Sequence, residues 1–149
     1  MPTIEINTFI IANIERCFNL ARSIDLHVDS MAKTKETAIA GRVSGLIEFG
    51  ETVTWRAKHF GVWHTLTSKI TGFDFPYSFT DEMVTGAFKS FKHQHLFFSQ
   101  NDGTLMIDIF EFESPFGIFG NLANVLFLKN YLRKLLQNRN RLIKENAEY

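Results

Sequence analysis

Alternation of apolar and polar residues over short stretches is the main pattern in the first 113 residues of the chain. Side chains of a strand point alternately to its two faces, so this pattern indicates strands with one buried face and one wet face. The clearest case is 52–60, where Val53, Trp55 and Ala57 share one face. By this pattern we expect strands at 3–11, 44–49, 52–60, 62–70, 79–88, 91–99 and 104–113.

Helical spacing replaces this alternation directly after the first predicted strand. Asn13 is a good helix N-cap, and the segment 14–21 that follows has its apolar residues on one helical face. Residues 25–31 predict a second short helical or irregular piece, and the polar segment 32–41 predicts an exposed connector. Pro76 lacks an amide hydrogen, so we expect its segment, 72–77, to be an edge or a turn.

The longest predicted element is a helix over residues 116–146. Residues 116–128 are apolar on almost every side, and a helix of that kind needs partners on more than one face. From Lys129 onward the helix is amphipathic, with leucine and isoleucine side chains along one side. We therefore expect the strands to supply a sheet that wraps around this helix.

The order of these elements predicts an α+β fold. Strands that follow one another in the chain favour antiparallel neighbours, and Asn101-Asp102-Gly103 is a strong hairpin signal between the last two. The predicted fold is a curved antiparallel β-sheet of about six to seven strands gripping a long C-terminal α-helix, with two short helices after the first strand. The length and the lack of a linker predict a single domain, 1–149.

Composition adds a preference for apolar surroundings. The chain has 16 phenylalanines against three tyrosines and two tryptophans, and phenylalanine supplies bulk to a core or a pocket wall without a polar group. Cys17 is the only cysteine, which excludes an intramolecular disulfide, and its apolar neighbours predict a buried thiol. The chain shows neither a signal peptide nor an apolar run long enough to span a bilayer, so we expect a soluble, cytoplasmic protein without integral membrane association.

The formal net charge is zero, which gives the molecule as a whole no electrostatic reason to bind nucleic acid. Six cations and no anion lie within 129–144, in the last turns of the predicted helix. Because cations suit the negative C-terminal pole of a helix, we interpret them as a solvated face. Contact with an anionic membrane or a nucleic acid is the alternative.

Four stretches carry a family resemblance: Phe-Thr-Asp-Glu-Met at 79–83, Gly-Ala-Phe at 86–88, Phe-Lys-His-Gln-His-Leu-Phe at 91–97 and Ser-Pro-Phe-Gly at 114–117. The Gly103-Thr104 turn and Asp108 complete the pattern. With the order of elements, they make the chain resemble the helix-grip or START-like superfamily, which includes the birch-pollen-allergen-like proteins, and within it the bacterial SRPBCC ligand-binding family. The resemblance implies the fold and a ligand cavity between sheet and helix. Phe91 stands where such sequences often carry tryptophan, so the bulk is kept and a donor is lost.

His93 and His95 are the most specific candidates for chemistry in the sequence. They are two residues apart in a predicted strand, so their side chains point to the same face. Alternate histidines can bind a metal, but zinc needs at least a third protein ligand, for which Asp108, His64 and Asp81 are the nearby candidates. Asp108 lies between apolar neighbours, and a buried carboxylate needs a partner, which we expect to be His95 across the hairpin. Such a pair is structural, orients a ligand or acts as a general base.

Further candidates are bulky or flexible side chains around the central strands. Trp55 shares the inward face of its strand, and His64 lies on the apolar side of the next strand, opposite Trp63. Each of these can equally be ordinary core. We assign no catalytic residue, no metal ligand and no cofactor. The predicted ligand-binding residues are Trp55, His64, Phe79, Met83, Phe88, Phe91, His93, His95, Asp108, Phe119, Leu122 and Leu126.

Three functions are compatible with these features. The first is a binding protein that encloses a small apolar or aromatic molecule between the sheet and the C-terminal helix. The second is an enzyme of the polyketide cyclase or dehydratase kind, with a His–Asp pair in the same cavity. The third is an interaction module whose interior is filled by its own phenylalanines. The chain has no Gly-rich phosphate loop, Cys-x-x-Cys, His-Glu-x-x-His or Gly-x-Ser-x-Gly motif.

Overall fold

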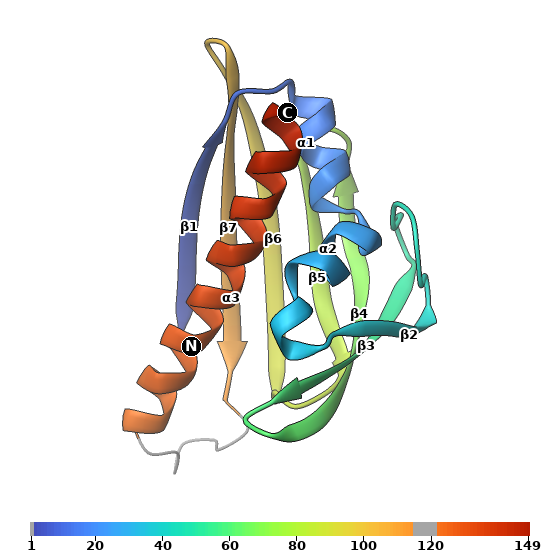
Figure 1. Ribbon diagram of the computed structural model, residues 1–149, viewed down its shortest axis with the longest axis vertical. Coiled ribbons are helices and arrows are strands. Elements are labelled where there is room, and N and C mark those ends of the chain that lie inside the picture. The colour runs from blue at the N-terminus through green and yellow to red at the C-terminus, as the bar shows by residue number, and fades with distance from the viewer. Residues whose placement is uncertain (1, 115–121) are drawn as a thin grey trace.

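A curved antiparallel sheet wraps around one long helix in the computed structural model, which describes residues 2–114 and 122–149, with the side chains of the long helix described from Val125 onward (Figure 1). The strands are β1 (Thr3–Ile10), β2 (Thr37–Gly41), β3 (Thr52–His59), β4 (Val62–Asp74), β5 (Ser78–Thr85), β6 (Ser90–Gln100) and β7 (Gly103–Glu113). The helices are α1 (Ile14–Ala21), α2 (Ile24–Ser30), the short 3-10 helix η1 (Ala32–Thr34) and α3 (Leu122–Glu148). The predicted fold class is confirmed.

The seven strands form one sheet in the order β1-β7-β6-β5-β4-β3-β2, and every neighbouring pair is antiparallel. β1 pairs with β7, so the first and last strands of the chain lie side by side. β6 and β7 stay in register from Ser90 opposite Glu113 to Gln100 opposite Gly103. The hairpin predicted at Asn101-Asp102-Gly103 is therefore confirmed, and Asn101 adopts the positive φ of 49° that such a turn uses.

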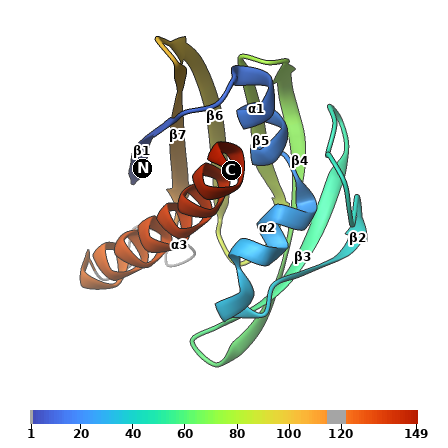
Figure 2. The same cartoon turned by 45° about the horizontal axis from the view of Figure 1, so that its top comes forward.

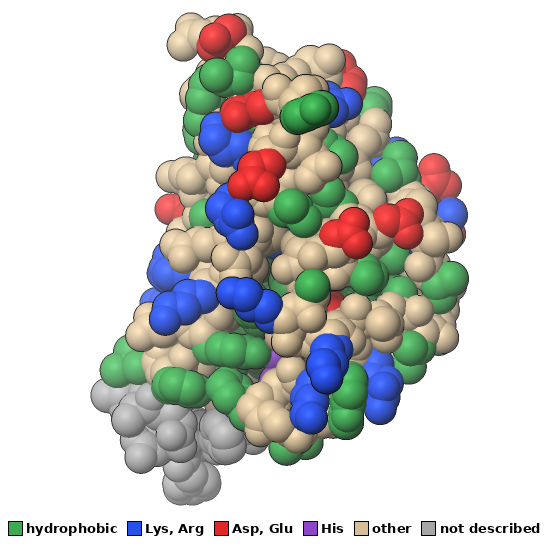
Figure 3. Space-filling view, in the orientation of Figure 1, with side chains coloured by type: hydrophobic (Ala, Val, Ile, Leu, Met, Phe, Trp, Pro, Cys, Tyr) green, Lys and Arg blue, Asp and Glu red, His purple; other side chains and the backbone are tan. Residues whose placement is uncertain are grey.

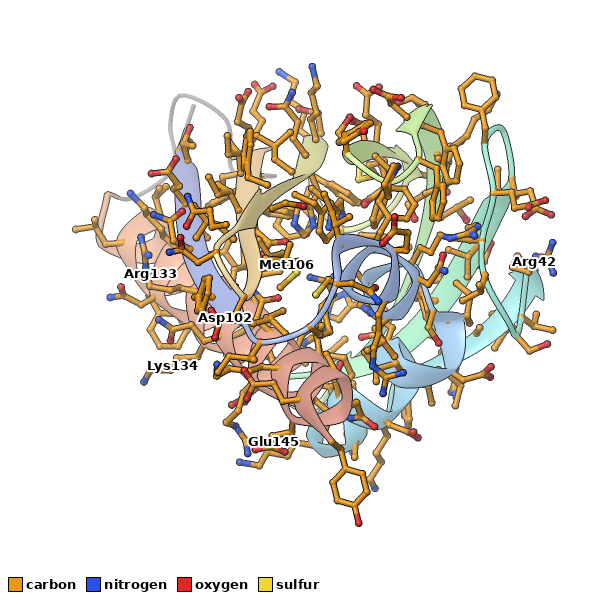
Figure 4. All side chains as sticks on the ribbon, turned by 90° about the horizontal axis from the view of Figure 1, so that it is seen from above. Arg42, Asp102, Met106, Arg133, Lys134 and Glu145 are labelled. Atoms are coloured by element: carbon orange, nitrogen blue, oxygen red, sulfur yellow. The ribbon has the colours of Figure 1, made fainter. Side chains whose placement is uncertain are left out.

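Helices α1 and α2 cover part of the concave face of the sheet (Figure 2). Asn13 caps α1 by accepting a hydrogen bond from the Arg16 amide at 2.8 Å, as the sequence predicts. The buried face of α1 carries Phe18 and Cys17, and the prediction of a buried thiol is confirmed. Figure 4 shows Met106 of β7 pointing into the space enclosed by the sheet and α1, where it belongs to the same core.

The apolar segment 44–49 does not form the predicted strand. Leu46 makes only an isolated bridge with Ser23, while Ile47 is buried in the core. Gly45 and Gly50 have positive φ values of 75° and 82°, which are incompatible with a regular strand. Of the apolar residues in this loop only Ile47 is buried, because Leu46 and Phe49 are 38% and 65% exposed.

One other boundary differs from the prediction. The segment 32–41, expected to be a connector, contains the exposed edge strand β2, which pairs with β3 through a register shift after Ala38. The segment 72–77 is an edge followed by a turn, as predicted, because Gly72 to Asp74 pair with β5 and not with β3, and β4 ends at Asp74. Pro76 lies in the turn that follows, where its missing amide hydrogen costs no ladder hydrogen bond.

Helix α3 is amphipathic as predicted in its C-terminal part, where Leu136 and Ile143 are buried. The sequence predicts partners on more than one face of its N-terminal part. There Leu128 packs against the core and the ring of Phe127 lies 5.5 Å from that of Phe60, whereas Leu126 and Phe127 remain 53% and 60% exposed. The predicted helical residues 116–121 lie outside the described part of the chain.

Within residues 2–114 and 122–149, none of the helices combines the length and the hydrophobicity that a bilayer span requires.

Candidate functional site

A cavity of about 380 Å³ lies between the concave face of the sheet and the helices α2 and α3. Near the lower centre of Figure 3 a histidine is visible in a hollow of the surface, between hydrophobic and basic side chains. Most of the wall is apolar. From the strands it includes Val53, Leu66, Ile70 and Phe110, and from α3 it includes Leu128, Leu132, Leu135 and Leu136.

The structure brings together most of the residues that the sequence singled out. Asp108 lies behind the cavity wall with no exposed surface, Met83 packs against a separate core cluster, and Leu126 points to solvent. Phe119 and the side chain of Leu122 fall outside the described part of the chain. The predicted residues that line the cavity are Trp55, His64, Phe79, Phe88, Phe91, His93 and His95.

The inward face of β6 supplies the two histidines. Its burial alternates, with Phe91, His93, His95 and Phe97 all buried and the residues between them more exposed, which is the pattern of a strand with one face on the core. The His95 ring stacks on His93 with 3.7 Å between ring centroids and on Phe79 with 4.0 Å. Packing on both sides therefore holds the His95 ring in one orientation.

Asp108 is a buried carboxylate with three hydrogen-bond donors around it. His93 Nε2 donates to Oδ1 at 2.8 Å, Arg139 Nη1 donates to the same oxygen at 3.3 Å, and Asn140 Nδ2 donates to Oδ2 at 2.6 Å. A buried charge needs partners of this kind, because its desolvation is costly. The sequence correctly required a partner but missed the donors from α3.

The predicted pairing of His95 with Asp108 is only partly right. His95 lies directly opposite Asp108 in the strand register, and its Nδ1 is 3.4 Å from Asp108 Oδ1. The shorter hydrogen bond of His95, however, runs from Nε2 to Oδ2 of Asp81 on the other neighbouring strand, at 2.7 Å. Because the ring turns toward Asp81, the close contact with Asp108 is made by His93.

Arg139 joins these groups from α3. Its Nη1 donates to Asp108 and Asn140, and its Nη2 donates to the Ala21 carbonyl at 3.0 Å and to His95 Nδ1 at 3.4 Å. The same Nδ1 is 3.4 Å from Asp108 Oδ1, and His95 Nε2 donates to Asp81 on its other side. His95 therefore connects Asp81 with Asp108 and Arg139.

Burial and hydrogen bonding set the charge of the other groups. Burial, reinforced by the neighbouring His95, lowers the pKa of His93 to about 4, so its imidazole is neutral at pH 7. Burial opposes the ionisation of Asp108, but the hydrogen bonds from the histidines and the charge of Arg139 outweigh it and hold its pKa well below the usual value. Burial likewise opposes ionisation of Asp81, yet the hydrogen bond from His95 leaves its pKa lowered.

The interpretation of the cations of α3 as a solvated face is wrong for Arg139. Arg139 is 3% exposed, whereas Lys134 and Glu145 point away from the sheet in Figure 4. The signal was present in the helical spacing, because Arg139 follows Leu135 and Leu136 and precedes Ile143 on the same buried face. A cation in line with apolar positions indicates a buried partner.

A second set of polar groups lines the cavity near α2 and the β3–β4 turn. His27 Nε2 lies 2.8 Å from Glu36 Oε1, and the His27 ring packs on Trp55 at 4.3 Å between centroids. His59 Nδ1 is 2.6 Å from the Tyr131 hydroxyl, which connects β3 to α3, and burial lowers the pKa of His59. The sequence did not single out these four polar residues, because the members of each pair lie on different elements and no local pattern connects them.

Asp81, His93 and His95 are also the group most suited to hold a metal ion, since one ligand atom from each lies within 4.8 Å of the others. Three protein ligands match the minimum of a catalytic zinc site. The neighbouring guanidinium argues against it, because a cation 3.4 Å from His95 Nδ1 repels a metal ion. Each of the three residues also makes a hydrogen bond within the protein.

No protein-family model matches the sequence, and no curated protein sequence matches it at a significant level.

Solved structures with the same architecture match over nearly the whole chain. The protein TTHA0849 from Thermus thermophilus superposes with a TM-score of 0.74 at 17% identity, over 98% of this chain and 99% of that one. Ara h 8.0201 gives 0.72 at 12% identity over 98% and 97%. The di-domain ARO/CYC StfQ from the steffimycin biosynthetic pathway gives 0.71 at 15% identity, over 98% of this chain and 50% of that one. At these identities the likeness is one of fold, and the chain has a helix-grip fold.

Proposed function

We propose that this protein binds a small apolar or aromatic molecule in the cavity between the sheet and α3. The observation that carries the proposal is a cavity of about 380 Å³ with mostly apolar walls and a cluster of polar side chains at one side. Ligand pockets typically measure about 300–1,000 Å³ and combine apolar walls with a few placed polar groups. The volume is at the lower end of that range, which suits a ligand of a few fused or linked rings.

The walls and the polar cluster have separate tasks in this proposal. Leu66, Phe88 and Leu132 provide apolar area that gains free energy when a ligand displaces water from it. His93 and Asp81 provide orientation, because a polar ligand atom gains a hydrogen bond in only one pose. Fold similarity to the ARO/CYC protein StfQ, which belongs to a biosynthetic pathway, is compatible with a small-molecule ligand in this cavity.

The second candidate function is catalysis of the cyclase or dehydratase kind. It is favoured by one contact, the 2.8 Å hydrogen bond between His93 and Asp108, which fixes the proton on Nε2 and leaves Nδ1 as a potential base. The pKa of His93, about 4, makes this imidazole a weak base at neutral pH. We therefore place ligand binding first.

Native mass spectrometry of the purified protein tests the proposal directly. We expect an added non-covalent mass that disappears when the same sample is denatured, and its value identifies the ligand class. Thermal unfolding before and after removal of that ligand should show a higher melting temperature for the loaded protein, because a ligand of the folded state stabilises it by mass action.

Two other results would overturn the binding proposal. A bound metal ion that survives dialysis and is lost in a His95→Gln variant would assign the Asp81, His93 and His95 group to metal binding. Consumption of an added aromatic polyketide, with a rate that rises through about pH 4 as His93 loses its proton, would assign the cavity to catalysis.

A further inference from the structure

The polar side of the cavity presents hydrogen-bond acceptors. His93 donates through Nε2 to Asp108, so its other ring nitrogen, Nδ1, has a free lone pair. Among residues 2–114 and 122–149, no hydrogen bond reaches His93 Nδ1 or Asp81 Oδ1. The same part of the chain has no fully buried side-chain nitrogen or oxygen without a partner, so neither atom is sealed within the protein. Both residues line the cavity, and we take these two atoms to face it.

The strongest donor in the same place, Arg139, is already largely engaged. The four Nη hydrogens among its five N–H hydrogens are directed at Asp108, Asn140, the Ala21 carbonyl and His95. The Nε2 proton of His95 is directed at Asp81. A ligand that reaches the cluster therefore meets the open acceptors of His93 and Asp81, while these five hydrogens point elsewhere.

The charge of the cluster also favours a ligand that donates a hydrogen bond over one that carries a negative charge. Asp81 and Asp108 are ionised because the pKa of each is lowered, and His93, with a pKa of about 4, is neutral at pH 7. The positive charge of Arg139 pairs with Asp108 at 3.3 Å, whereas Asp81, whose side chain is 18% exposed, has no lysine or arginine partner in the described part of the chain. In a low-dielectric cavity such a charge attracts a donor and repels a second carboxylate strongly.

We propose that the ligand carries a hydrogen-bond donor, such as a phenolic hydroxyl, at the end that enters this cluster, and that a carboxylate there is rejected. The inference rests on the proposed binding function and specifies its ligand class. In this pose the hydroxyl donates to Asp81 Oδ1 or to His93 Nδ1, and the aromatic part packs on the apolar wall beside Phe79.

Three probes with the same ring system test this inference: naphthol, methoxynaphthalene and naphthoate, all substituted at the same ring position. Binding is measured by isothermal titration calorimetry and by the shift in melting temperature. We expect naphthol to bind about tenfold to a hundredfold more tightly than methoxynaphthalene, since a hydrogen bond to a charged group contributes on that scale. Naphthoate should bind at least about tenfold more weakly than methoxynaphthalene.

An Asp81→Asn variant removes the charge while its amide oxygen can still accept the proton of His95. Its NH₂ group also supplies a donor, so we expect the naphthol preference to shrink and naphthoate binding to improve by about tenfold or more. Asp102→Asn, the same substitution at the exposed tip of the β6–β7 hairpin, should leave the order of the probes unchanged. Circular dichroism checks that both variants fold. The ranking of the three probes in the unsubstituted protein does not depend on either variant.

The outcomes separate the two proposals. Equal affinity for naphthol and methoxynaphthalene, or naphthoate binding as tight as naphthol, would overturn the donor preference and leave the cavity as a ligand site. Failure of all three probes to release heat or to raise the melting temperature would count against both the donor preference and the binding function.

Discussion

Asp108 is the residue on which the buried polar cluster depends. It has no exposed surface, and its carboxylate accepts hydrogen bonds from His93, Arg139 and Asn140. The cluster is tolerated in an apolar core because these partners and the positive charge of Arg139 replace water around the carboxylate. A change at this position leaves Arg139 buried without its counter-charge.

We therefore expect Asp108→Asn to lower the free energy of unfolding by about 3–5 kcal/mol, the usual cost of breaking a buried charge pair. Urea denaturation monitored by circular dichroism measures the effect. Asp102→Asn, at an exposed hairpin turn, should change it by no more than about 0.5 kcal/mol. Equal destabilisation by the two variants would contradict the role assigned to Asp108.

His93 makes stability depend on pH in a defined window. Its pKa falls from the ordinary value of 6.5 to about 4 on folding, so between these values the unfolded chain binds the proton more readily than the folded protein. Stability should therefore fall as the pH is lowered from 6.5 to 4, by up to about 3 kcal/mol from this group. The lowered pKa values of Asp81 and Asp108 act below this window, where stability is lost as these carboxylates are protonated.

A His93→Gln variant tests the assignment, because glutamine keeps a donor for Asp108 and does not titrate. Free energies of unfolding at pH 7 and pH 5 should differ less in the variant than in the unsubstituted protein. Any contribution of His59, whose pKa burial also lowers, remains in both proteins and cancels in the comparison. An unchanged pH dependence would show that His93 is not the group responsible.

At the scale of elements, α3 is held at its C-terminal end by a cation from α1. Arg16 donates from Nε to the Ala147 carbonyl at 2.9 Å and from Nη2 to the Asn146 carbonyl at 2.7 Å. These carbonyls are at the negative pole of the helix and have no partner within it. Lys144 and Glu148 add contacts to β1 and to the turn after it.

Arg16→Ala should lower the free energy of unfolding by about 1–2 kcal/mol, because two charge-assisted hydrogen bonds at the helix end are lost. The matched control is Arg141→Ala, which removes an exposed ion pair with Glu145 on α3 and should cost no more than about 0.5 kcal/mol. Chemical denaturation of the two variants side by side provides the measurement. A smaller effect at Arg16 than at Arg141 would contradict the proposed anchoring.

The elements were predictable where the pattern of side chains is local. In β6 the alternation alone placed His93 and His95 on one buried face, and Asn13 marked the start of α1. The pattern failed at 44–49 because apolar residues also occur in loops, and only backbone pairing separates a loop from a strand. It also failed to separate Arg139 from the solvated cations, since its partner Asp108 is on another element.

At the scale of the whole molecule, the curvature of the sheet leaves space that α2 and α3 cover without filling. Ala57 on the inward face of β3 is 5% exposed and lines the cavity, so a larger side chain there would project into empty apolar space. Filling such space commonly stabilises a protein by about 0.5–2 kcal/mol. The same change removes room that a ligand needs.

We expect Ala57→Leu to keep or raise the melting temperature of the ligand-free protein and to abolish the rise caused by naphthol. Ala40→Leu makes the same change on the exposed edge strand β2 and should leave the naphthol response intact. Differential scanning fluorimetry with and without the probe measures both. A full naphthol response in Ala57→Leu would place the probe outside this cavity.

The sequence by itself determined the α+β class, the strand and helix order and the inward face of β6, because periodicity, capping and turn residues act over a few neighbours. The tertiary structure alone decided which groups meet: Asp81, His93, Asp108 and Arg139 come from β5, β6, β7 and α3, and they assemble only when the sheet closes around the helix. The charge states and the cavity follow from that assembly, because desolvation depends on everything packed around a group.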